Sequence, residues 1–518
     1  MRDRPADMPP LPGGRGKFCN FAAFLPEVAP RFGGKPAVIA ADGTLTYADL
    51  ERETNRLAAG LAAAGVRPGE RVALMLGNSA KFPLAFYALL KAGAAAVPLD
   101  VTFKARETAG LLDQLEAAAL IVEAASAREG AAAAVHARRA CRLLSLGLAG
   151  LPEAAWATPL EGLAPAAVPP AAPHPLNAEA TALICYTSGS TGRPKGAEIT
   201  HGNLWAANRS WLEEVLVLTP DDVAVTPLPL AHSYGLNGGL SAPLMAGATV
   251  VVMARFDPAA VVEAIRAHRA TAFFGVATMY RRLLELPGDI NCPTLQMAVS
   301  GAADMPLALA KEFQGRVGAP VVRGYGASEI FRVVTFRRGD PDERPERIGR
   351  PAGGAEVRFV DEEGRPVAPG GVGEMEVRGP TVMRGYYGDP EENAAAFRDG
   401  WFRTGDLARM DAEGYVTIAG RKKDTILRGG YSVFPREVED VLLSHPGVAE
   451  AVVVGVPDER LGQEVKAVVV ARNAAQVTAE DLIGFCKARL AHFKYPRIVE
   501  FSTGLPRGAV GKIRRSAL

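Results

Sequence analysis

Short apolar runs alternate with longer segments of helical period between Pro36 and Glu123. The runs include PAVIAA, RVALMLG and AAVPLD, and each is typical of a buried strand. Segments such as YADLERETNRLAAGLAAAG separate them and favour helices. Strands that alternate with helices predict a parallel sheet, because each helix returns the chain to the end of the sheet at which the previous strand began. The first part of the chain is therefore expected to form an α/β unit.

The pattern changes four times further along the chain. An Ala/Pro-rich stretch at residues 164–175 cannot pack a sheet and predicts a surface connection. Strand and helix alternation resumes from Ala180, and between Gly349 and Gly420 it gives way to period-two strands with Gly/Asp turns. From Asp424 the pattern is that of a small α+β domain. We therefore predict a multidomain α/β protein with α/β subdomains at about 30–175 and 176–345, a β-rich subdomain at 346–420 and a small C-terminal lid.

Composition excludes several classes of protein. The chain has 518 residues, enough for several folding units, and its 58 Lys and Arg residues balance 57 Asp and Glu residues. No excess charge favours nucleic acid as a partner. Five cysteines without a Cys-x-x-Cys pair argue against a zinc site or a disulfide framework. Because no signal peptide and no run of about 18 apolar residues stands out, we expect a cytoplasmic protein without an integral membrane segment.

The most informative segment follows an apolar strand that ends at Tyr186. The loop after it consists of Thr187, Ser188, Gly189, Ser190, Thr191, Gly192, Arg193, Pro194 and Lys195. Glycines let backbone amides approach phosphate oxygens, hydroxyls donate hydrogen bonds, and the ammonium neutralises charge. It is not a Walker A loop, because Arg and Pro separate Gly192 from Lys195. The segment predicts a polyphosphate site of another kind.

Five motifs together resemble those of the adenylate-forming, or AMP-binding, superfamily, in its order. They are YTSGSTGRPKG, GYGASE at 324–329, GWFRTGD at 400–406, GRKKD at 420–424 and LPRGAVGK at 505–512. The chain is identified as a member of the acyl-CoA synthetase branch, which includes the fatty acid–CoA ligases. The resemblance implies a large AMP-binding N-terminal domain at 1–420, a hinge at 421–423, and a mobile lid at 424–518 that rotates between two half-reactions.

The resemblance also implies the reaction. A carboxylate and ATP form an acyl-adenylate and pyrophosphate, and the acyl group then passes to the thiol of coenzyme A with release of AMP. Attack on the α-phosphate builds negative charge, so the site must supply cations and aligned donors. ATP, CoA and a small carboxylic acid are therefore the expected partners, with Mg²⁺ as the cofactor.

Similarity to the family assigns roles residue by residue. Lys512 is the catalytic lysine that bridges the carboxylate and the α-phosphate, and Glu329 holds Mg²⁺ on the phosphates. The phosphates contact Thr187, Ser188, Gly189, Ser190, Thr191, Gly192, Lys195 and Ser328. The adenine and ribose contact Gly301, Ala302, Ala303, Gly324, Tyr325, Asp406 and Arg421. Lys423 is the hinge residue, and Gly429 and Gly430 admit the pantetheine of CoA.

The acid is expected to bind near the segment PLPLAHSYGLNGGL. His232, a candidate catalytic residue, and Tyr234 follow a strand in the region that borders the acyl tunnel in this family. Gly235, Gly239 and Gly326 complete the predicted acyl pocket. A glycine within a helix costs on the order of 1 kcal/mol against alanine, and either an open tunnel or tight helix packing would offset that cost. We expect a medium- or long-chain fatty acid.

The sequence is also compatible with other functions. Arg281 or Arg282 could pair with a second carboxylate and select a dicarboxylic acid such as malonate. Adjacent helical positions lie about 100° apart, so at most one of the two reaches the pocket. An aryl-CoA ligase and an adenylating enzyme that loads a carrier protein are alternatives, and a non-catalytic nucleotide-binding protein is a remote one. The sequence leaves oligomer formation open.

Overall fold

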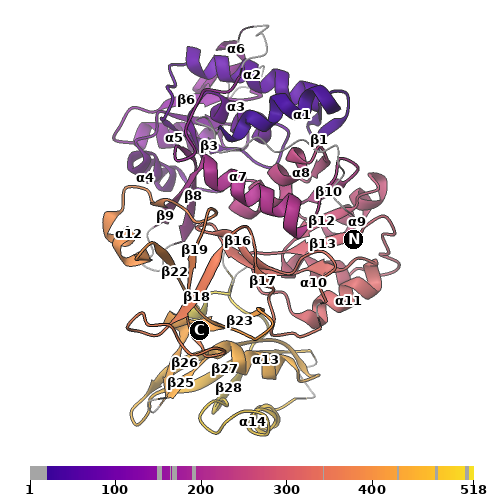
Figure 1. Cartoon of the computed structure of the whole chain (residues 1–518), viewed down its shortest axis with the longest axis vertical. Coiled ribbons are helices and arrows are strands. Elements are labelled where there is room, and N and C mark those ends of the chain that lie inside the picture. The colour runs from indigo at the N-terminus through magenta and orange to yellow at the C-terminus, as the bar shows by residue number, and fades with distance from the viewer. Residues whose placement is uncertain are drawn as a thin grey trace. The chain divides into compact units, whose positions relative to one another are not determined.

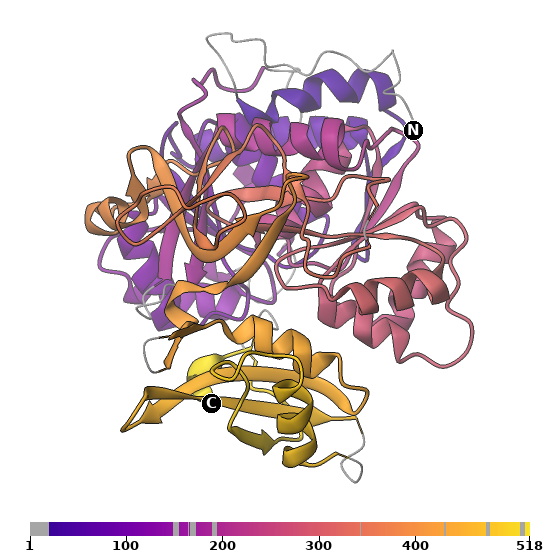
Figure 2. The same cartoon turned by 60° about the horizontal axis from the view of Figure 1, so that its bottom comes forward.

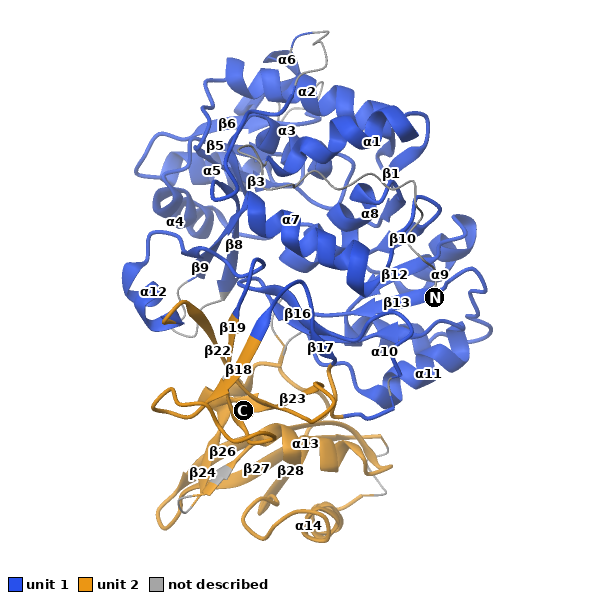
Figure 3. Cartoon of the chain, viewed as in Figure 1, with its two compact units in different colours: residues 1–345, 349–356, 378–397 blue, residues 346–348, 357–377, 398–518 orange. Residues whose placement is uncertain are grey.

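The computed structural model describes residues 20–148, 155–163, 165, 172–188, 194–341, 343–428, 431–472, 477–507 and 513–518. The chain divides into two compact units, which Figure 3 shows in blue and orange. Unit 1 comprises residues 1–345, 349–356 and 378–397, and unit 2 comprises residues 346–348, 357–377 and 398–518. The mixed α/β fold class is confirmed. The predicted boundaries of the domains and of the hinge stay predictions.

An eight-stranded sheet in unit 1 has the order β20-β9-β8-β4-β3-β5-β6-β7. Figure 1 labels β3, β6, β8 and β9 of this sheet. The centre of its parallel part is formed by β3 (Arg71–Met75), β4 (Ala95–Pro98), β5 (Ala119–Val122) and β6 (Arg142–Ser145). On the two sides of these strands, β8 pairs parallel with β4, and β7 (Thr158–Pro159) pairs parallel with β6. The helices before and between β3, β4, β5 and β6 are α2 (Tyr47–Ala63), α3 (Lys81–Lys91), α4 (Ala105–Leu115) and α5 (Ala127–His136). This is the alternation that the sequence predicts, and the apolar strand residues lie in the core.

A second sheet in unit 1 has seven strands in the order β14-β13-β12-β10-β11-β1-β2. It contains β1 (Pro36–Ala40), β2 (Gly43–Thr46), β10 (Val223–Thr226), β11 (Thr249–Val252), β12 (Ala272–Gly275), β13 (Met297–Ser300) and β14 (Val321–Val322). Phe273 on β12 packs in one core with Tyr280 and Phe313, which come from α10 (Ala277–Leu284) and α11 (Leu307–Val317). The first two strands thus join a sheet built mostly from a much later part of the sequence, a pairing that local periodicity cannot predict.

An antiparallel hairpin extends the eight-stranded sheet on one side. It consists of β8 (Thr181–Ser188) and β9 (Pro194–Thr200). The sequence predicts that the first strand ends at Tyr186, but pairing continues through Thr187↔Lys195 and Ser188↔Pro194. Cross-strand backbone hydrogen bonds therefore hold both ends of the predicted phosphate loop in regular strands.

Unit 2 begins with antiparallel strands and ends with a small α+β part, yellow in Figure 2. The strands β22 (Trp401–Met410) and β23 (Val416–Arg421) form a hairpin. The last sheet contains β24 (Ile426–Arg428), β25 (Tyr431–Val433), β26 (Val448–Asp458), β27 (Gly462–Ala471) and β28 (Ile498–Phe501). The helices α13 (Pro435–Leu443) and α14 (Ala479–Lys487) bury Leu442 and Leu482 in one core with the valines of this sheet. In the described part of the chain, no helix has the length and apolar character needed to cross a membrane.

Candidate active site

Glu329 lies in the turn between β15 (Gly324–Ala327) and β16 (Phe331–Thr335), which pair antiparallel. Its Oε1 atom accepts a hydrogen bond from Thr187 Oγ1 at 3.3 Å and another from the Tyr386 hydroxyl at 3.2 Å. Within the described part of the chain, Oε2 has no hydrogen-bond partner. The described residues therefore hold the carboxylate through one oxygen only.

Lys195 is the second residue of β9 (Pro194–Thr200). Its ammonium is ion-paired with Glu392 on α12 (Pro390–Ala396), and its side chain is only 11% exposed. The same ammonium lies 5.5 Å from the centre of the Tyr386 ring. A nearly buried lysine beside an acidic residue and a tyrosine is a cation ready to bind an anion once its present partner is displaced.

Tyr386 contacts both Lys195 and Glu329, and the sequence analysis did not predict it as a site residue. It lies on β20 (Gly385–Tyr386), which pairs antiparallel with β9 so that Tyr386 faces Ala197. Burial, and after it the nearby Glu329 carboxylate, raises the pKa of Tyr386, so its hydroxyl stays protonated and donates to Glu329. No local signal marks this tyrosine, because only the pairing of distant strands brings it to the site.

Ser328 also contacts the segment around Tyr234. Ser328 Oγ lies 3.0 Å from Ser233 Oγ, and the Tyr234 hydroxyl donates to the Val299 carbonyl oxygen at 2.8 Å. The Tyr234 ring stacks on Trp211 with centroids 6.4 Å apart and planes 15° apart. The structure thus brings together residues that the sequence assigns to phosphate binding and to the acyl pocket.

The predicted adenine loop follows β13. Ala302 has φ of +62°, a left-handed conformation that is uncommon for a residue with a Cβ atom and that often occurs at functional sites. A Cβ at Gly301 would lie 3.2 Å from the Tyr234 ring. Tyr325 lies on β15, opposite Val334 of β16. Gly301 and Tyr234 therefore connect the predicted adenine residues to the predicted acyl pocket.

Close packing is a sufficient reason for glycine at both Gly324 and Gly326, and contact with a ligand is not needed to explain them. A Cβ at Gly324 would lie 2.4 Å from Arg332 Nη2, and one at Gly326 would lie 1.8 Å from the Phe331 carbonyl oxygen. Neither position has room for a side chain. Their predicted contacts with adenine and acid stay predictions.

The helix after His232 is irregular. Residues Gly235–Ser241 form a π-helical stretch, a feature that is common at functional sites. A Cβ at Gly235 would lie 2.2 Å from the Pro229 carbonyl oxygen, and one at Gly239 would lie 2.6 Å from Thr226 Oγ1. Tight packing is thus a sufficient physical reason for both glycines. His232 lies just before this helix, and its backbone N–H donates to the Pro229 carbonyl oxygen at 3.1 Å.

Two predicted ribose ligands meet in unit 2. Asp406 on β22 faces Arg421 on β23, and Arg421 Nε lies 2.9 Å from Asp406 Oδ1. The Asp406 side chain is 6% exposed, whereas that of Arg421 is half exposed. Lys423, the predicted hinge residue, lies exposed in the short helix η5 (Lys422–Asp424).

Several predicted site residues lie outside the described residues. They are Gly189, Ser190, Thr191, Gly192, Gly429, Gly430 and Lys512, and the side chain of Ser188 belongs with them. Their roles stay predictions from resemblance.

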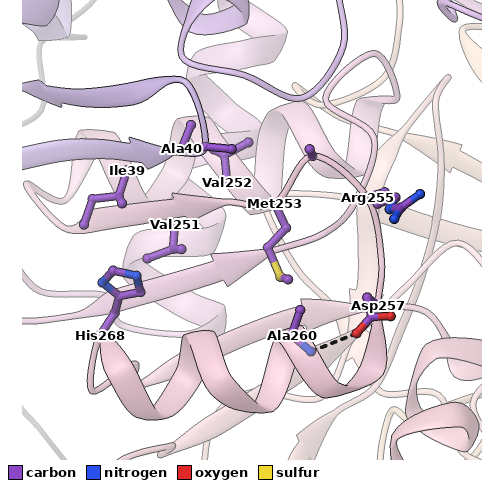
Figure 4. A pocket seen from close by; sticks show the side chains of 11 residues that line it. Ile39, Ala40, Val251, Val252, Met253, Arg255, Asp257, Ala260 and His268 are labelled. Carbon is purple, nitrogen blue, oxygen red and sulfur yellow. Dashed lines mark hydrogen bonds between the residues drawn. The ribbon is translucent and has the colours of Figure 1, made fainter.

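A separate pocket of about 490 Å³ lies beside β1, β11 and α9 (Pro258–Ala267) in unit 1 (Figure 4). Its lining includes Ile39, Val251, Met253 and His268, and Asp257 at its edge accepts a hydrogen bond from the Ala260 backbone N–H at 2.9 Å. That contact caps α9. The predicted site residues do not line this pocket.

The groups at the end of the β8–β9 hairpin define a class of site. Hydroxyls from Thr187 and Tyr386 donate to the Glu329 carboxylate there, and the Lys195 ammonium lies near the ring of the same tyrosine. Cations and donors in this arrangement can bind phosphate oxygens directly and through a metal ion. These groups have the chemistry that a nucleotide-phosphate site requires.

Comparison with known proteins agrees with the geometry. The model of the AMP-binding enzyme family matches residues 25–387, and that of the AMP-binding enzyme C-terminal domain matches residues 437–512. The chain therefore belongs to the AMP-binding enzyme family, and the resemblance inferred from its motifs is confirmed.

Its relatives are CoA ligases. A feruloyl-CoA synthase from an Amycolatopsis species is 39% identical over 90% of this chain and 92% of its own length. A long-chain-fatty-acid–CoA ligase from Bacillus subtilis is 31% identical over 100% and 97% of the two chains. A benzoate CoA ligase from Burkholderia xenovorans superposes with a TM-score of 0.85 at 31% identity, covering 96% and 99% of the two chains. The chain is an AMP-forming acid–thiol ligase that uses ATP and CoA.

Proposed function

We propose that Lys195, Thr187 and Glu329 bind the phosphates of Mg·ATP while the acid attacks the α-phosphate. The observation that carries this proposal is the Glu329 carboxylate, which two hydroxyls hold through Oε1, while Oε2 has no hydrogen-bond partner among the described residues. Magnesium prefers one or two carboxylates together with phosphate oxygens, so this residue fits the ion. Lys195 would exchange Glu392 for a phosphate oxygen.

The remaining roles complete the two half-reactions. Lys512 contributes the cation that bridges the acid and the α-phosphate, and Asp406 with Arg421 binds the ribose hydroxyls. The ion pair between Asp406 and Arg421 supports this proposal, because it fixes the carboxylate in one orientation. The loop at Gly429 and Gly430 admits the pantetheine of CoA. The reaction takes place in the cytoplasm.

The acid that fits best is a compact one with a polar far end. The close packing at Gly235 and Gly239 favours a short pocket over a long alkyl tunnel. Buried polar atoms near Tyr234 also suit an acid that carries hydrogen-bonding groups. A medium- or long-chain fatty acid is the competing candidate, and the likeness to the Bacillus subtilis ligase supports it.

Pyrophosphate release tests the proposal. Purified protein with ATP and Mg²⁺ would be assayed with acetate, hexanoate, dodecanoate, malonate and benzoate, each with and without CoA. We expect turnover with at least one acid, increased by CoA. Release that does not respond to CoA would favour loading of a carrier protein, and release with no acid at all would contradict acyl-adenylate formation.

A further inference from the structure

A buried arginine near Tyr234 has no acidic partner among the residues that the structure describes. Arg332 lies on β16 and is 9% exposed. Its Nη1 donates to the Ser300 carbonyl oxygen at 3.0 Å, its Nη2 to the Val322 carbonyl oxygen at 3.1 Å, and its Nε to Thr335 Oγ1 at 2.8 Å. Among the described residues, no carboxylate forms an ion pair with it. These bonds use three of the five N–H groups of a guanidinium, so two are left over.

The guanidinium remains charged in spite of its burial. Desolvation lowers the pKa of Arg332 to about 10, which is still well above neutral pH. Its two nearest titratable neighbours, Tyr234 and Tyr280, are protonated, because burial raises the pKa of both hydroxyls. A buried cation that lacks a counter-charge is unfavourable, and a charge on a bound substrate would compensate it.

Arg332 lies between the residues predicted for adenine and those predicted for the acid. Its guanidinium carbon is 5.0 Å from the ring centre of Trp211, on which Tyr234 stacks. Its Nη2 atom approaches Gly324 so closely that a Cβ there would lie 2.4 Å away. The residue that supplies its Nη1 acceptor, Ser300, immediately precedes Gly301.

Other buried polar atoms in this region also lack partners. Ser300 Oγ belongs to a residue that is 1% exposed, and within the described part of the chain it forms no hydrogen bond. The same holds for Thr226 Oγ1, which lies against Gly239, and for Asn237 Oδ1 on the same π-helical stretch as Gly239. A buried polar group without a partner is rare in native proteins, and a ligand that supplies the partner is one explanation. An alkyl chain could not supply it.

We infer that Arg332, together with Ser300 Oγ, binds a second carboxylate at the far end of the acid, and that the substrate is a dicarboxylic acid. This inference rests on the proposed function and names its substrate class. A carboxylate accepts two N–H donors of a guanidinium and one hydroxyl at the same time. Arg282, one of the two adjacent arginines that the sequence offers for this role, fits it less well, because its side chain is exposed and lies over Phe256.

A purely structural role for Arg332 would give a different experimental result from a role in binding the acid. If the guanidinium only ties the ends of β13 and β14 to β16, its loss would lower stability and would slow the enzyme equally with every acid. A role in binding changes the preference between acids. The measurement must therefore be a ratio between two acids that differ only at the far end.

The test uses matched acids in the pyrophosphate assay with Mg·ATP: adipate against hexanoate, and terephthalate against 4-methylbenzoate. We expect the wild-type protein to favour the diacid in kcat/KM by at least about tenfold in one pair. Arg332→Met should lower that ratio by on the order of 10- to 100-fold, and Arg332→Lys should restore part of it. Thermal melting of each variant shows whether it folds.

Ser300→Ala keeps the carbonyl that Arg332 contacts and removes only the unpartnered hydroxyl. It should reduce kcat/KM for the diacid about three- to tenfold and leave the monoacid unchanged, so the inference can be judged even if Arg332→Met does not fold. Turnover of monoacids with no preference for either diacid would overturn the inference and leave the proposed function standing. Absence of turnover with every acid would overturn both.

Discussion

Asp406 and Arg421 face each other across the β22–β23 hairpin, with Arg421 Nε 2.9 Å from Asp406 Oδ1. The carboxylate is nearly buried and the guanidinium is half exposed. The arginine therefore orients the carboxylate, whose two oxygens can accept further hydrogen bonds, as the proposed ribose contact requires. The family motifs supply the two residues, and the register of the hairpin places them opposite each other.

Asp406→Asn should raise the KM for ATP on the order of 10- to 100-fold, because an amide accepts fewer hydrogen bonds and does not attract Arg421. The measurement is pyrophosphate release against ATP concentration. Asp361→Asn is the matched control, since Asp361 belongs to an exposed ion pair with Arg365 in the same unit. Equal effects of the two changes would contradict a role of Asp406 in nucleotide binding.

Tyr386→Phe removes the hydroxyl that donates to Glu329 and keeps the ring near Lys195. We expect the Mg²⁺ concentration needed for half-maximal rate to rise about three- to tenfold, because the free carboxylate loses one of its two orienting hydrogen bonds. Titration of Mg²⁺ at saturating ATP measures this. Tyr387→Phe alters the neighbouring tyrosine and should leave the Mg²⁺ requirement unchanged. An unaltered Mg²⁺ requirement in Tyr386→Phe would count against a positioning role.

Glu392→Gln should lower the KM for ATP by about two- to fivefold. The carboxylate of Glu392 is ion-paired with Lys195, so the phosphates of ATP must compete with it, and the amide competes less well. Glu391→Gln, an exposed change on the same helix, is the control. A raised KM in Glu392→Gln would instead show that Glu392 holds Lys195 in its binding position.

His201 is expected to make stability depend on pH. It is fully buried, its Nδ1 accepts a hydrogen bond from the Phe21 backbone N–H at 2.9 Å, and burial lowers its pKa to about 4. Because the unfolded chain takes up this proton near pH 6.5, the contribution of His201 is complete above that pH and is lost as the pH falls toward 4. The loss amounts to about 3 kcal/mol. Denaturant unfolding of the wild type and of His201→Asn at pH 7.5 and 5 should show a smaller pH effect in the variant, and equal pH effects would refute the assignment.

Lys512→Ala should abolish adenylation and leave the attack of CoA on a supplied acyl-adenylate comparatively intact. The lysine is proposed to stabilise charge only in the first half-reaction. Pyrophosphate release measures the first step, and formation of acyl-CoA from synthetic acyl-adenylate measures the second. An equal loss of both steps would argue against this role.

Residues close together in the sequence were predictable, because their chemistry and their periodicity are local properties. The strand–helix alternation of the first part of the chain belongs to this group, and so does the choice of the segments around Thr187 and Glu329 as candidates for the site, whose roles stay predictions. The end of β8 was not predictable to the residue, because cross-strand pairing up to Ser188 decides it.

The sequence by itself determined the family, the reaction class, the α/β fold and the acidic and basic residues that phosphate chemistry requires. Only the tertiary structure placed Tyr386 against Glu329, paired Lys195 with Glu392, and joined β1 and β2 to a sheet from a later part of the chain. It also showed that Arg332 is buried without an acidic partner among the described residues. Burial and long-range strand pairing are properties of the folded chain as a whole, and a local pattern of residues does not determine them.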